Sequence, residues 1–229
     1  MRPRWTPPAI VVAAFAALAI GCGGGASLVG NEDASVVISF DAWKATEDPK
    51  ATFDQCGAPV FAVDVTPDKA WTSIAVAGTR PDGRPYVELV EHARGTAWAP
   101  GRLADIQRTW RARILADLAG PAGALEAACR TVGVELEAVS AREHAQACGF
   151  IHDAAVEGRL VHRPDTLLDA SLIGAVKRDV GDGAWVWSRK NSQVVISPLV
   201  AATIAVGAVA SDVLVPAGFK SLDDYLDEE

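Results

Sequence analysis

The chain has 229 residues, half of them apolar, which is enough for one sizeable domain with a tail or for two small domains. Its formal net charge of -8 provides no overall positive field that would favour binding to nucleic acid. A local basic patch can still bind nucleic acid despite the negative net charge. The four cysteines, Cys22, Cys56, Cys129 and Cys148, show no C-x-x-C spacing, so neither a zinc site nor a disulfide scaffold is indicated.

The N-terminal segment carries a signal-like pattern. Two arginines precede the apolar run Ala9–Ile20, and Gly21, Cys22 and a glycine cluster follow it. A basic start, an apolar run of this length and small residues after it are typical of a secretory signal. Residues 1–33 are therefore predicted to be an apolar leader with a Gly-rich linker. The leader is either an export or lipid-anchoring signal or a mis-started extension.

The first part of the main domain is predicted to be rich in strands. Ser35–Phe40 has the composition of a strand, and Asp41–Asp48 is either a short helix or a loop. Turn residues then separate three further runs, because Pro fixes φ and Asp can hydrogen-bond its own backbone. These runs predict an antiparallel meander of three strands, Phe61–Val65, Trp71–Ala77 and Tyr86–His92.

The second part is predicted to alternate helices with strands. The expected strands are Arg113–Leu118, Val134–Val139, Leu160–His162 and Ala184–Ser188. The expected helices are Arg102–Arg111, Ala124–Val132, Ala141–Glu157, Pro164–Val180 and Leu199–Ala210, followed by an acidic tail over 211–229. Three consecutive strands and then alternating helices and strands predict an α/β fold with a mixed sheet flanked by helices.

Two aspartates are the candidate catalytic and metal-binding residues. Asp64 lies inside an apolar strand, where an unpaired charge is costly, and Asp117 lies near the end of the fourth strand. If the first and fourth strands are neighbours, the two carboxylates converge, and bound Mg²⁺ or Mn²⁺ would relieve their repulsion. Such an ion can activate water and stabilise the leaving oxygen in phosphodiester cleavage. The alternative is that Asp64 lies on an edge strand and faces water.

Basic side chains provide candidate contacts to DNA. The predicted contacts are Arg108, Arg111, Arg189 and Lys190. The alternative is a solvated helix face for the first two and a charged turn for the last two. The four histidines show no metal-ligand spacing, so His92, His144, His152 and His162 are predicted to be structural or surface residues.

Five stretches, taken in order, resemble a known family. They are FAVDVTPDKAWTSIAVAG, YVELVEHARGTAW, ILADLAGPA, LVHRPDTLLDA and WVWSRKNSQVVISPLVAATIA. Together they resemble the C-terminal nuclease domain of tailed-phage terminase large subunits, especially those of phages that infect actinobacteria. The resemblance runs from about Val36 to Ala210 and implies a ribonuclease H-like fold over residues 34–210. It also implies a metal-dependent endonuclease that cuts concatemeric viral DNA during packaging.

The resemblance also implies the partners and the site. The partners would be double-stranded DNA, a separate terminase ATPase chain, the small terminase subunit and the portal, in the host cytoplasm and without stable membrane association. Asp64 matches the family's first-strand metal ligand, and Asp117 matches the acid after the fourth strand. Val195 stands where similar proteins commonly carry a further acid. The candidates to replace that acid are Asp169, Asp179 and Asp182.

Two features of the sequence leave alternatives open. No G-x-x-x-x-G-K-[ST] phosphate loop occurs, so the resemblance covers the nuclease and not the ATPase motor. Valine cannot ligate Mg²⁺, so the nuclease is expected to be impaired, or the chain is an inactive prophage remnant that keeps only the fold. A secreted or lipid-anchored binding protein, with its anchor in residues 1–22, is the third hypothesis.

Overall fold

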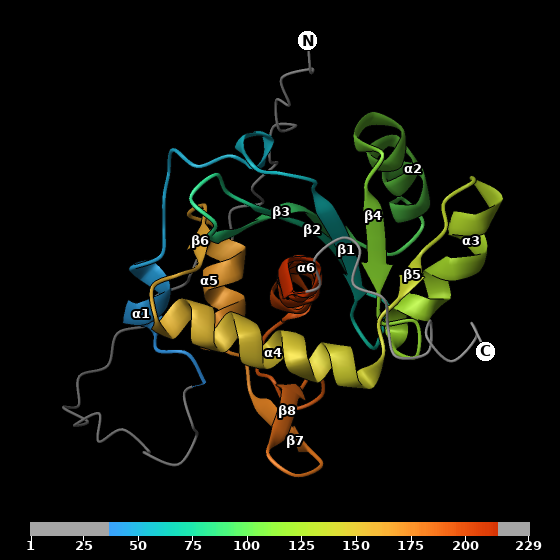
Figure 1. The fold of residues 1–229 in the computed structure, drawn as a ribbon. Helices are drawn as coiled ribbons and strands as arrows, with labels where there is room; N and C mark the ends of the chain where they lie inside the picture. The colour runs from blue at the N-terminus through green and yellow to red at the C-terminus, as the bar shows by residue number, and fades with distance from the viewer. Residues whose placement is uncertain (1–36, 215–229) are drawn as a thin grey trace, which may run out of the picture. The chain divides into compact units, whose positions relative to one another are not determined.

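A six-stranded mixed sheet forms the centre of residues 37–214, the part of the chain that a computed structural model describes. Its strands are β1 (Val60–Val65), β2 (Trp71–Thr79), β3 (Pro85–Arg94), β4 (Arg113–Ala116), β5 (Glu137–Ala138) and β6 (Val161–His162). They lie in the order β5-β4-β1-β2-β3-β6, as Figure 1 shows. β1, β2 and β3 form an antiparallel meander, while β4, β5 and β6 join in parallel. The predicted mixed α/β sheet and its meander are confirmed.

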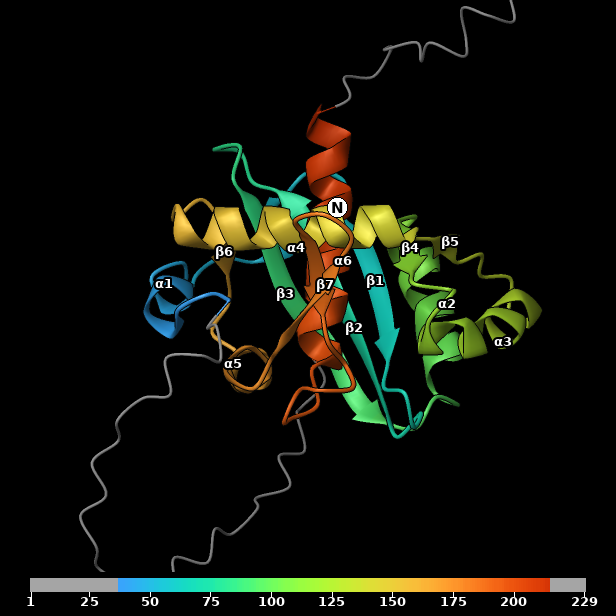
Figure 2. The same ribbon diagram turned by 90° about the horizontal axis from the view of Figure 1, so that it is seen from below.

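Helices cover both faces of the sheet. They are α1 (Phe40–Lys44), α2 (Ala99–Trp110), α3 (Glu126–Thr131), α4 (Ala141–Val156), α5 (Thr166–Ile173) and α6 (Ser197–Leu214), with the 3₁₀ turns η1 (Phe53–Gln55) and η2 (Pro121–Leu125). α6 lies against β1, β2 and β3, and α4 packs across it (Figures 1 and 2). On the opposite face of β1, Phe61 contacts Phe53, which in turn contacts Trp110 of α2. Side chains alternate along a strand, so even-numbered residues of β1 face α6 and odd-numbered residues face away from it.

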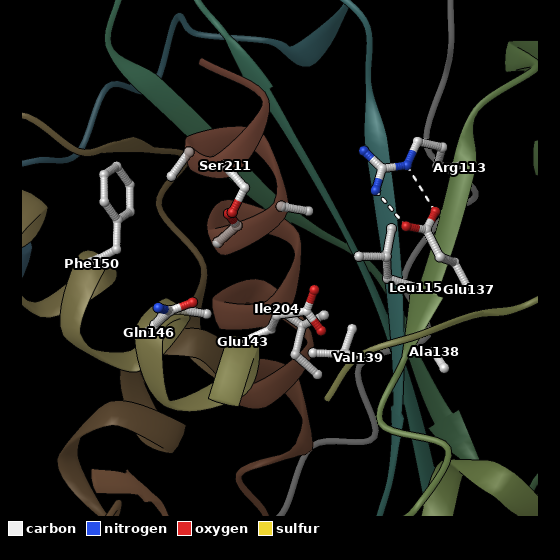
Figure 3. Close-up of a pocket in the computed structure, with 14 residues that line it drawn as sticks. Arg113, Leu115, Glu137, Ala138, Val139, Glu143, Gln146, Phe150, Ile204 and Ser211 are labelled. Atoms are coloured by element: carbon white, nitrogen blue, oxygen red, sulfur yellow. Dashed lines mark hydrogen bonds and ion pairs between the residues drawn. The ribbon is translucent and has the colours of Figure 1, made fainter. Parts of the chain in front are cut away.

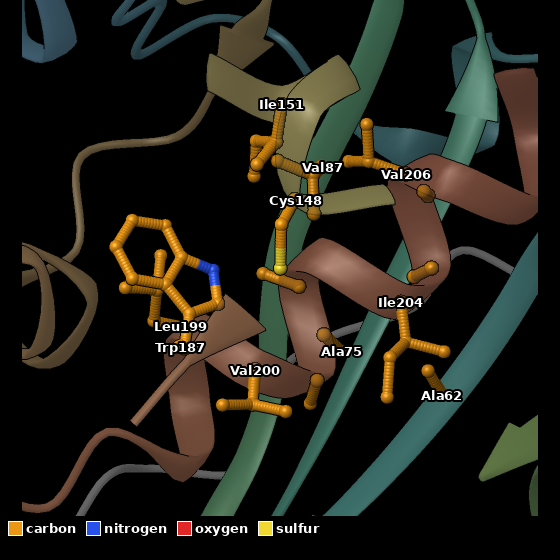
Figure 4. Close-up of a cluster of buried hydrophobic side chains, with 14 of the residues drawn as sticks. Ala62, Ala75, Val87, Cys148, Ile151, Trp187, Leu199, Val200, Ile204 and Val206 are labelled. Atoms are coloured by element: carbon orange, nitrogen blue, oxygen red, sulfur yellow. The ribbon is translucent and has the colours of Figure 1, made fainter. Parts of the chain in front are cut away.

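The core is organised around α6. This helix is apolar on all sides, which is typical of a helix that is buried all round. Leu199, Val200 and Ile204 pack between the sheet and α4, as Figure 4 shows. Trp187 closes one end of the cluster, and its indole Nε1 donates to Thr203 Oγ1 at 2.9 Å. That bond ties the strand carrying Trp187 to α6, and this link positions the loop that follows the strand.

The crossing of α4 and α6 depends on a glycine. A Cβ added at Gly207 would lie 2.3 Å from Cβ of Ala147, so the two helices meet at their backbones. We expect Gly207→Ala to lower the free energy of unfolding by about 1–3 kcal/mol, because overpacking forces the helices apart. Gly149→Ala, on α4 where an added Cβ meets nothing within 4 Å, is the control. It should stabilise the protein by about 0.5–1 kcal/mol. Urea denaturation measures the free energy of unfolding of both variants. If the two substitutions changed it equally, the predicted close packing of α4 and α6 would be contradicted.

Two predicted elements are wrong in part. The helix predicted over Pro164–Val180 ends at Ile173, and residues 177–180 instead form a strand. Asp165 caps the helix by accepting from the N–H groups of Leu167 and Leu168. The helix then stops before Gly174, where an added Cβ would lie 2.4 Å from a methyl group of Val194. The helix therefore ends at a C-cap glycine that also packs closely against a segment 20 residues further along.

A small antiparallel hairpin takes the place of the missing helical turns. Its strands are β7 (Lys177–Val180) and β8 (Ala184–Trp187). Gly181 and Gly183 in the turn have φ of +64° and +81°, which glycine adopts without strain. The strand predicted over Ser35–Phe40 is also wrong for residues 37–40, the part that the structure describes. There α1 begins at Phe40, and Ser39 is its N-cap.

The predicted leader and linker, residues 1–33, lie outside the described residues, as do residues 215–229 of the predicted tail. α6 runs to Leu214, so the first four residues of that tail belong to the helix. Between residues 37 and 214, none of the helices combines the length and the apolarity needed to cross a membrane.

Candidate active site

Asp64 lies on β1, and Asp117 directly follows β4, the parallel neighbour of β1. β1 and β4 pair so that Val60 is opposite Arg113 and Ala62 is opposite Leu115. Continuing this register by two residues brings Asp64 beside Asp117, which directly follows β4. Side chains two residues apart on a strand point to the same face of the sheet, so Asp64 shares the face of Val60 and Ala62. This is the face that α6 covers. The strand order therefore brings the two carboxylates to one edge.

The carboxylate of Asp64 is completely buried. Its exposed fraction is 0%, and every residue of β1 is buried with it. Burial raises the pKa of the Asp64 carboxyl, and the charge and hydrogen bonds of Arg189 act in the opposite direction. Asp64 is thus not an edge-strand acid that faces water. Its charge depends on a partner supplied by another part of the fold.

Arg189 is that partner. Its Nη2 and Nε lie 2.6 and 3.1 Å from Oδ1 of Asp64, and its Nη1 lies 3.4 Å from Oδ2 of Asp117. The guanidinium therefore bridges the two carboxylates. Burial by itself would lower the pKa of Arg189, but the attraction of Asp64 and Asp117 outweighs burial and raises that pKa above its usual value. Arg189 is one of the predicted contacts to DNA, and in the structure its side chain is directed to the two acids.

The loop that carries Arg189 is held at its start and within its turn. Trp187 of β8 is anchored on α6, and the N–H of Ser188 donates to the carbonyl of Val176 at 2.7 Å. The N–H of Asn191 donates to Ser188 Oγ at 3.3 Å, and this bond tightens the turn. Arg189 is thus positioned by the hairpin rather than by sequence neighbours of either acid.

The loop after β4 sets the position of Asp117. The N–H of Gly120 donates to Oδ1 of Asp117 at 3.0 Å. A Cβ at Gly120 would lie 2.7 Å from Oδ2 of Asp117, so this close approach requires glycine. The side chain of Asp117 is 17% exposed, which makes it more accessible than Asp64.

His144 is a third group at the site. It lies in the first turns of α4, and its Nδ1 is 3.8 Å from Oδ2 of Asp117. Burial, with the Arg189 charge adding to it, lowers the pKa of His144 to about 4, so the imidazole is neutral near pH 7. Its Nε2 is buried and has no hydrogen-bond partner among the described residues. His144 is predicted from the sequence to be a structural or surface residue, and no spacing in the sequence selects it as part of a site.

The start of α6 lies close to Asp64 but supplies no acid. Ser197, the first residue of α6, hydrogen-bonds through Oγ to Ser73 Oγ at 2.7 Å, and Ser73 is the cross-strand partner of Asp64. Residues 188–199 contain no Asp or Glu. Val195 is 38% exposed, and its carbonyl accepts from Ser171 Oγ at 3.1 Å. The position where an acid was expected is therefore filled by an apolar side chain.

The acids considered as replacements have other surroundings. Asp169 accepts from Trp43 Nε1 at 2.9 Å and from Lys44 Nζ at 3.3 Å, so its partners belong to α1. Asp179 is exposed on β7, and Asp182 is exposed in the turn of the hairpin. The structure does not bring any of the three into hydrogen-bond contact with Asp64 or Asp117.

The remaining predicted DNA contacts are exposed. Arg108 pairs with Asp105 at 3.0 Å on the surface of α2, and Arg111 ends that helix in a left-handed conformation. α2 packs on the face of β1 that is opposite to Asp64, so these two arginines are not grouped with the acids. Lys190 is exposed directly beside Arg189 in the sequence.

A separate cavity of about 320 Å³ lies between β4, β5, α4 and α6. Its rim includes Arg113, whose Nε donates to Glu137 Oε2 at 2.8 Å, and Phe150 lies across from this pair (Figure 3). The residues that line it do not include Asp64, Asp117 or Arg189. The cavity and the acid pair are therefore distinct features.

The acid pair fits a cation. Within residues 37–214, no three acidic, histidine or cysteine side chains are grouped as a ready metal site. However, carboxylate oxygens are the donors that Mg²⁺ and Mn²⁺ prefer, and a positive charge already bridges Asp64 and Asp117. The guanidinium of Arg189 stands in for a divalent ion between the two carboxylates. A metal ion fits this pair when it takes the place of the guanidinium.

The strand order, the helices on both faces and the acids at one edge define a ribonuclease H-like α/β domain. No protein-family profile and no curated protein sequence matches the chain. Solved structures do match, and the chain has the fold of the nuclease domains of phage large terminases.

Three of these structures give the extent of the match. The large terminase of bacteriophage HK97 matches with a TM-score of 0.62 at 16% identity, over 75% of this chain and 43% of the terminase. The large terminase nuclease of thermophilic phage G20c with bound magnesium matches at 0.53 and 13% identity, over 76% and 97%. A nuclease-domain variant from the Sf6 large terminase with manganese matches at 0.50 and 14% identity, over 74% and 98%. The chain thus spans less than half of the HK97 protein and nearly all of the isolated nuclease domains.

Proposed function

We propose that this chain is a terminase-type nuclease domain that cleaves double-stranded DNA with a divalent cation held by Asp64 and Asp117. The observation that carries the proposal is the pair of carboxylates that two adjacent parallel strands bring together, bridged by a positive charge. Support also comes from the fold, because matching terminase nucleases have been solved with magnesium and with manganese. The proposed context is the cutting of concatemeric viral DNA during packaging, in the host cytoplasm.

Each acid has a distinct role in the proposal. Asp64 is buried on a rigid central strand, so it fixes the position of the cation. Asp117 is partly exposed and held by Gly120, so it orients the cation toward the substrate side. When bound, the cation supplies the chemistry that activates water and stabilises the leaving oxygen of the phosphodiester. Lys190, exposed next to Arg189, is proposed to contact the DNA backbone.

The proposed partners follow from the same role. Double-stranded DNA is the substrate, and a separate ATPase chain, the small terminase subunit and the portal are the proposed protein partners. Because the sequence has no phosphate-loop motif, the proposal for this chain concerns cleavage and not the motor.

Plasmid cleavage by the full chain in Mn²⁺, in Mg²⁺ and with a chelator tests the proposal. We expect the wild type to nick supercoiled plasmid in Mn²⁺, the chelator to stop the reaction and Asp117→Asn to abolish it. Val195→Asp should increase the rate, because it returns a carboxylate to the segment before α6. If no variant cuts and none binds Mn²⁺ by calorimetry, the proposed function is wrong.

An inactive remnant with the same fold is the second candidate. It is favoured by two observations: Arg189 already neutralises the acid pair, and Val195 cannot bind a metal ion. The same assay separates the two candidates. Cleavage by Val195→Asp alone would identify an inactivated copy, whereas cleavage by the wild type would rule the remnant out.

A further inference from the structure

We infer that His144 is the third donor to the divalent cation, in place of the carboxylate that Val195 does not provide. This inference rests on the proposed function, since it concerns the ion that Asp64 and Asp117 are proposed to hold. It assigns a nitrogen ligand to a site that the sequence predicted from carboxylates alone.

The first argument is geometric. Oδ2 of Asp117 is approached by two groups, Nη1 of Arg189 at 3.4 Å and Nδ1 of His144 at 3.8 Å. The guanidinium and the imidazole therefore lie around the same carboxylate oxygen. A cation that replaces the guanidinium on Asp117 meets the imidazole as its next neighbour. The Nδ1 atom faces that oxygen, so it is the nitrogen that would donate its lone pair.

The second argument is the state of the imidazole. His144 is 5% exposed, and its Nε2 has no hydrogen-bond partner among the described residues. Leaving a buried polar atom unpaired costs about 1–3 kcal/mol, and such atoms often mark a functional site. His144 is thus a buried imidazole whose Nδ1 faces Asp117 and whose other nitrogen, Nε2, is unpaired within the described part of the chain.

The third argument is the lack of a competing donor. Asp169 is bonded to Trp43 and Lys44, and Asp182 is exposed in the hairpin turn. The loop and helix start that adjoin Asp64, residues 188–199, contain no acid. Among the described histidines, His144 is the one that lies within 4.0 Å of either acid of the pair.

A nitrogen donor has a chemical consequence. Mg²⁺ prefers an all-oxygen shell, whereas first-row transition-metal ions, of which Mn²⁺ binds most weakly, also accept an imidazole nitrogen. The site should therefore favour Mn²⁺ over Mg²⁺. Replacing His144 with aspartate should shift this preference toward Mg²⁺.

Pulsed electron paramagnetic resonance of bound Mn²⁺ tests the inference directly. The full chain would be loaded with Mn²⁺, and the spectrum would be examined for coupling to a directly bonded imidazole nitrogen. We expect the coupling in the wild type and its loss in His144→Gln, with Mn²⁺ affinity about tenfold lower or weaker still by calorimetry. His152→Gln, on a half-buried residue of the same helix that pairs with Asp153, is the matched control and should change neither. Arg189→Met provides a second background in which the competing guanidinium is removed.

The outcomes are distinguishable from a failure of the proposed function. Tight Mn²⁺ binding without nitrogen coupling, unchanged in His144→Gln, would overturn the inference and leave the proposed metal site intact. Mn²⁺ binding by neither the wild type nor Arg189→Met would overturn both. Because the coupling reports direct bonding, a merely structural role of His144 would not produce it.

Discussion

Replacing Arg189 with alanine is expected to lower the free energy of unfolding near pH 7 by about 3–5 kcal/mol when no divalent cation is present. The reason is that Asp64 is completely buried and Arg189 provides its hydrogen-bonded positive partner. Removing one member of a buried ion pair leaves the other charge without compensation. Urea denaturation in the presence of a chelator measures the change.

The effect should depend on pH with a definite sign. Without Arg189, burial holds the pKa of Asp64 above its unfolded value of about 3.9. When the pKa of a carboxyl is higher in the folded than in the unfolded state, folding favours its protonated form. The stability that this provides is fully present below the unfolded pKa and is lost as the pH rises through the folded pKa. The difference between Arg189→Ala and the wild type should therefore be small near about pH 4 and large near about pH 7.

A divalent cation should reverse the loss. Mn²⁺ at about 100 times its dissociation constant adds about 2.7 kcal/mol to the stability of a folded state that binds it. Because the guanidinium no longer competes, Arg189→Ala should be stabilised by Mn²⁺ more than the wild type is. Lys190→Ala, at the exposed neighbouring position, is the control and should change neither stability nor the response to Mn²⁺. An unchanged stability of Arg189→Ala near pH 7 would contradict the bridging role.

Asp64→Asn is expected to reduce the rate of plasmid cleavage at least about 10³-fold while the protein remains folded. A metal ion stabilises the transition state by several kcal/mol, and each 1.4 kcal/mol lost is about tenfold in rate. Asparagine is neutral and nearly the same size, and burial already favours the neutral form of this side chain. The initial rate of nicking and a urea denaturation curve measure the two effects separately.

Asp68→Asn is the matched control for this variant. Asp68 lies in the turn after β1, where it accepts from Thr66 Oγ1 at 2.6 Å and from the N–H of Ala70 at 3.0 Å. Both bonds can be made to an amide oxygen, and the residue is exposed, so cleavage should be unchanged. Cleavage by Asp64→Asn at the wild-type rate would show that Asp64 does not hold the catalytic cation.

The two candidate acids could be selected from the sequence because their signals are local. Asp64 is a charge inside an apolar, β-branched run, and Asp117 follows another short apolar run. The meander was predictable for the same reason, since turn residues separate three β-rich segments. The helix predicted through Val180 was wrong because it ends at Gly174, a glycine C-cap that the apolar pattern passes over, and Gly174 also packs against Val194.

The sequence by itself determined the mixed α/β class and the antiparallel meander, and it singled out Asp64 and Asp117 as candidates. Only the tertiary structure decided what those acids contact. Arg189 is 125 residues from Asp64 and reaches it because the β7–β8 hairpin is anchored on α6 through Trp187 and Thr203. His144 faces Asp117 because α4 crosses α6 at Gly207 and Ala147. Secondary structure follows from short-range patterns, whereas the partner of a buried charge depends on how distant elements pack, and no spacing in the chain encodes that directly.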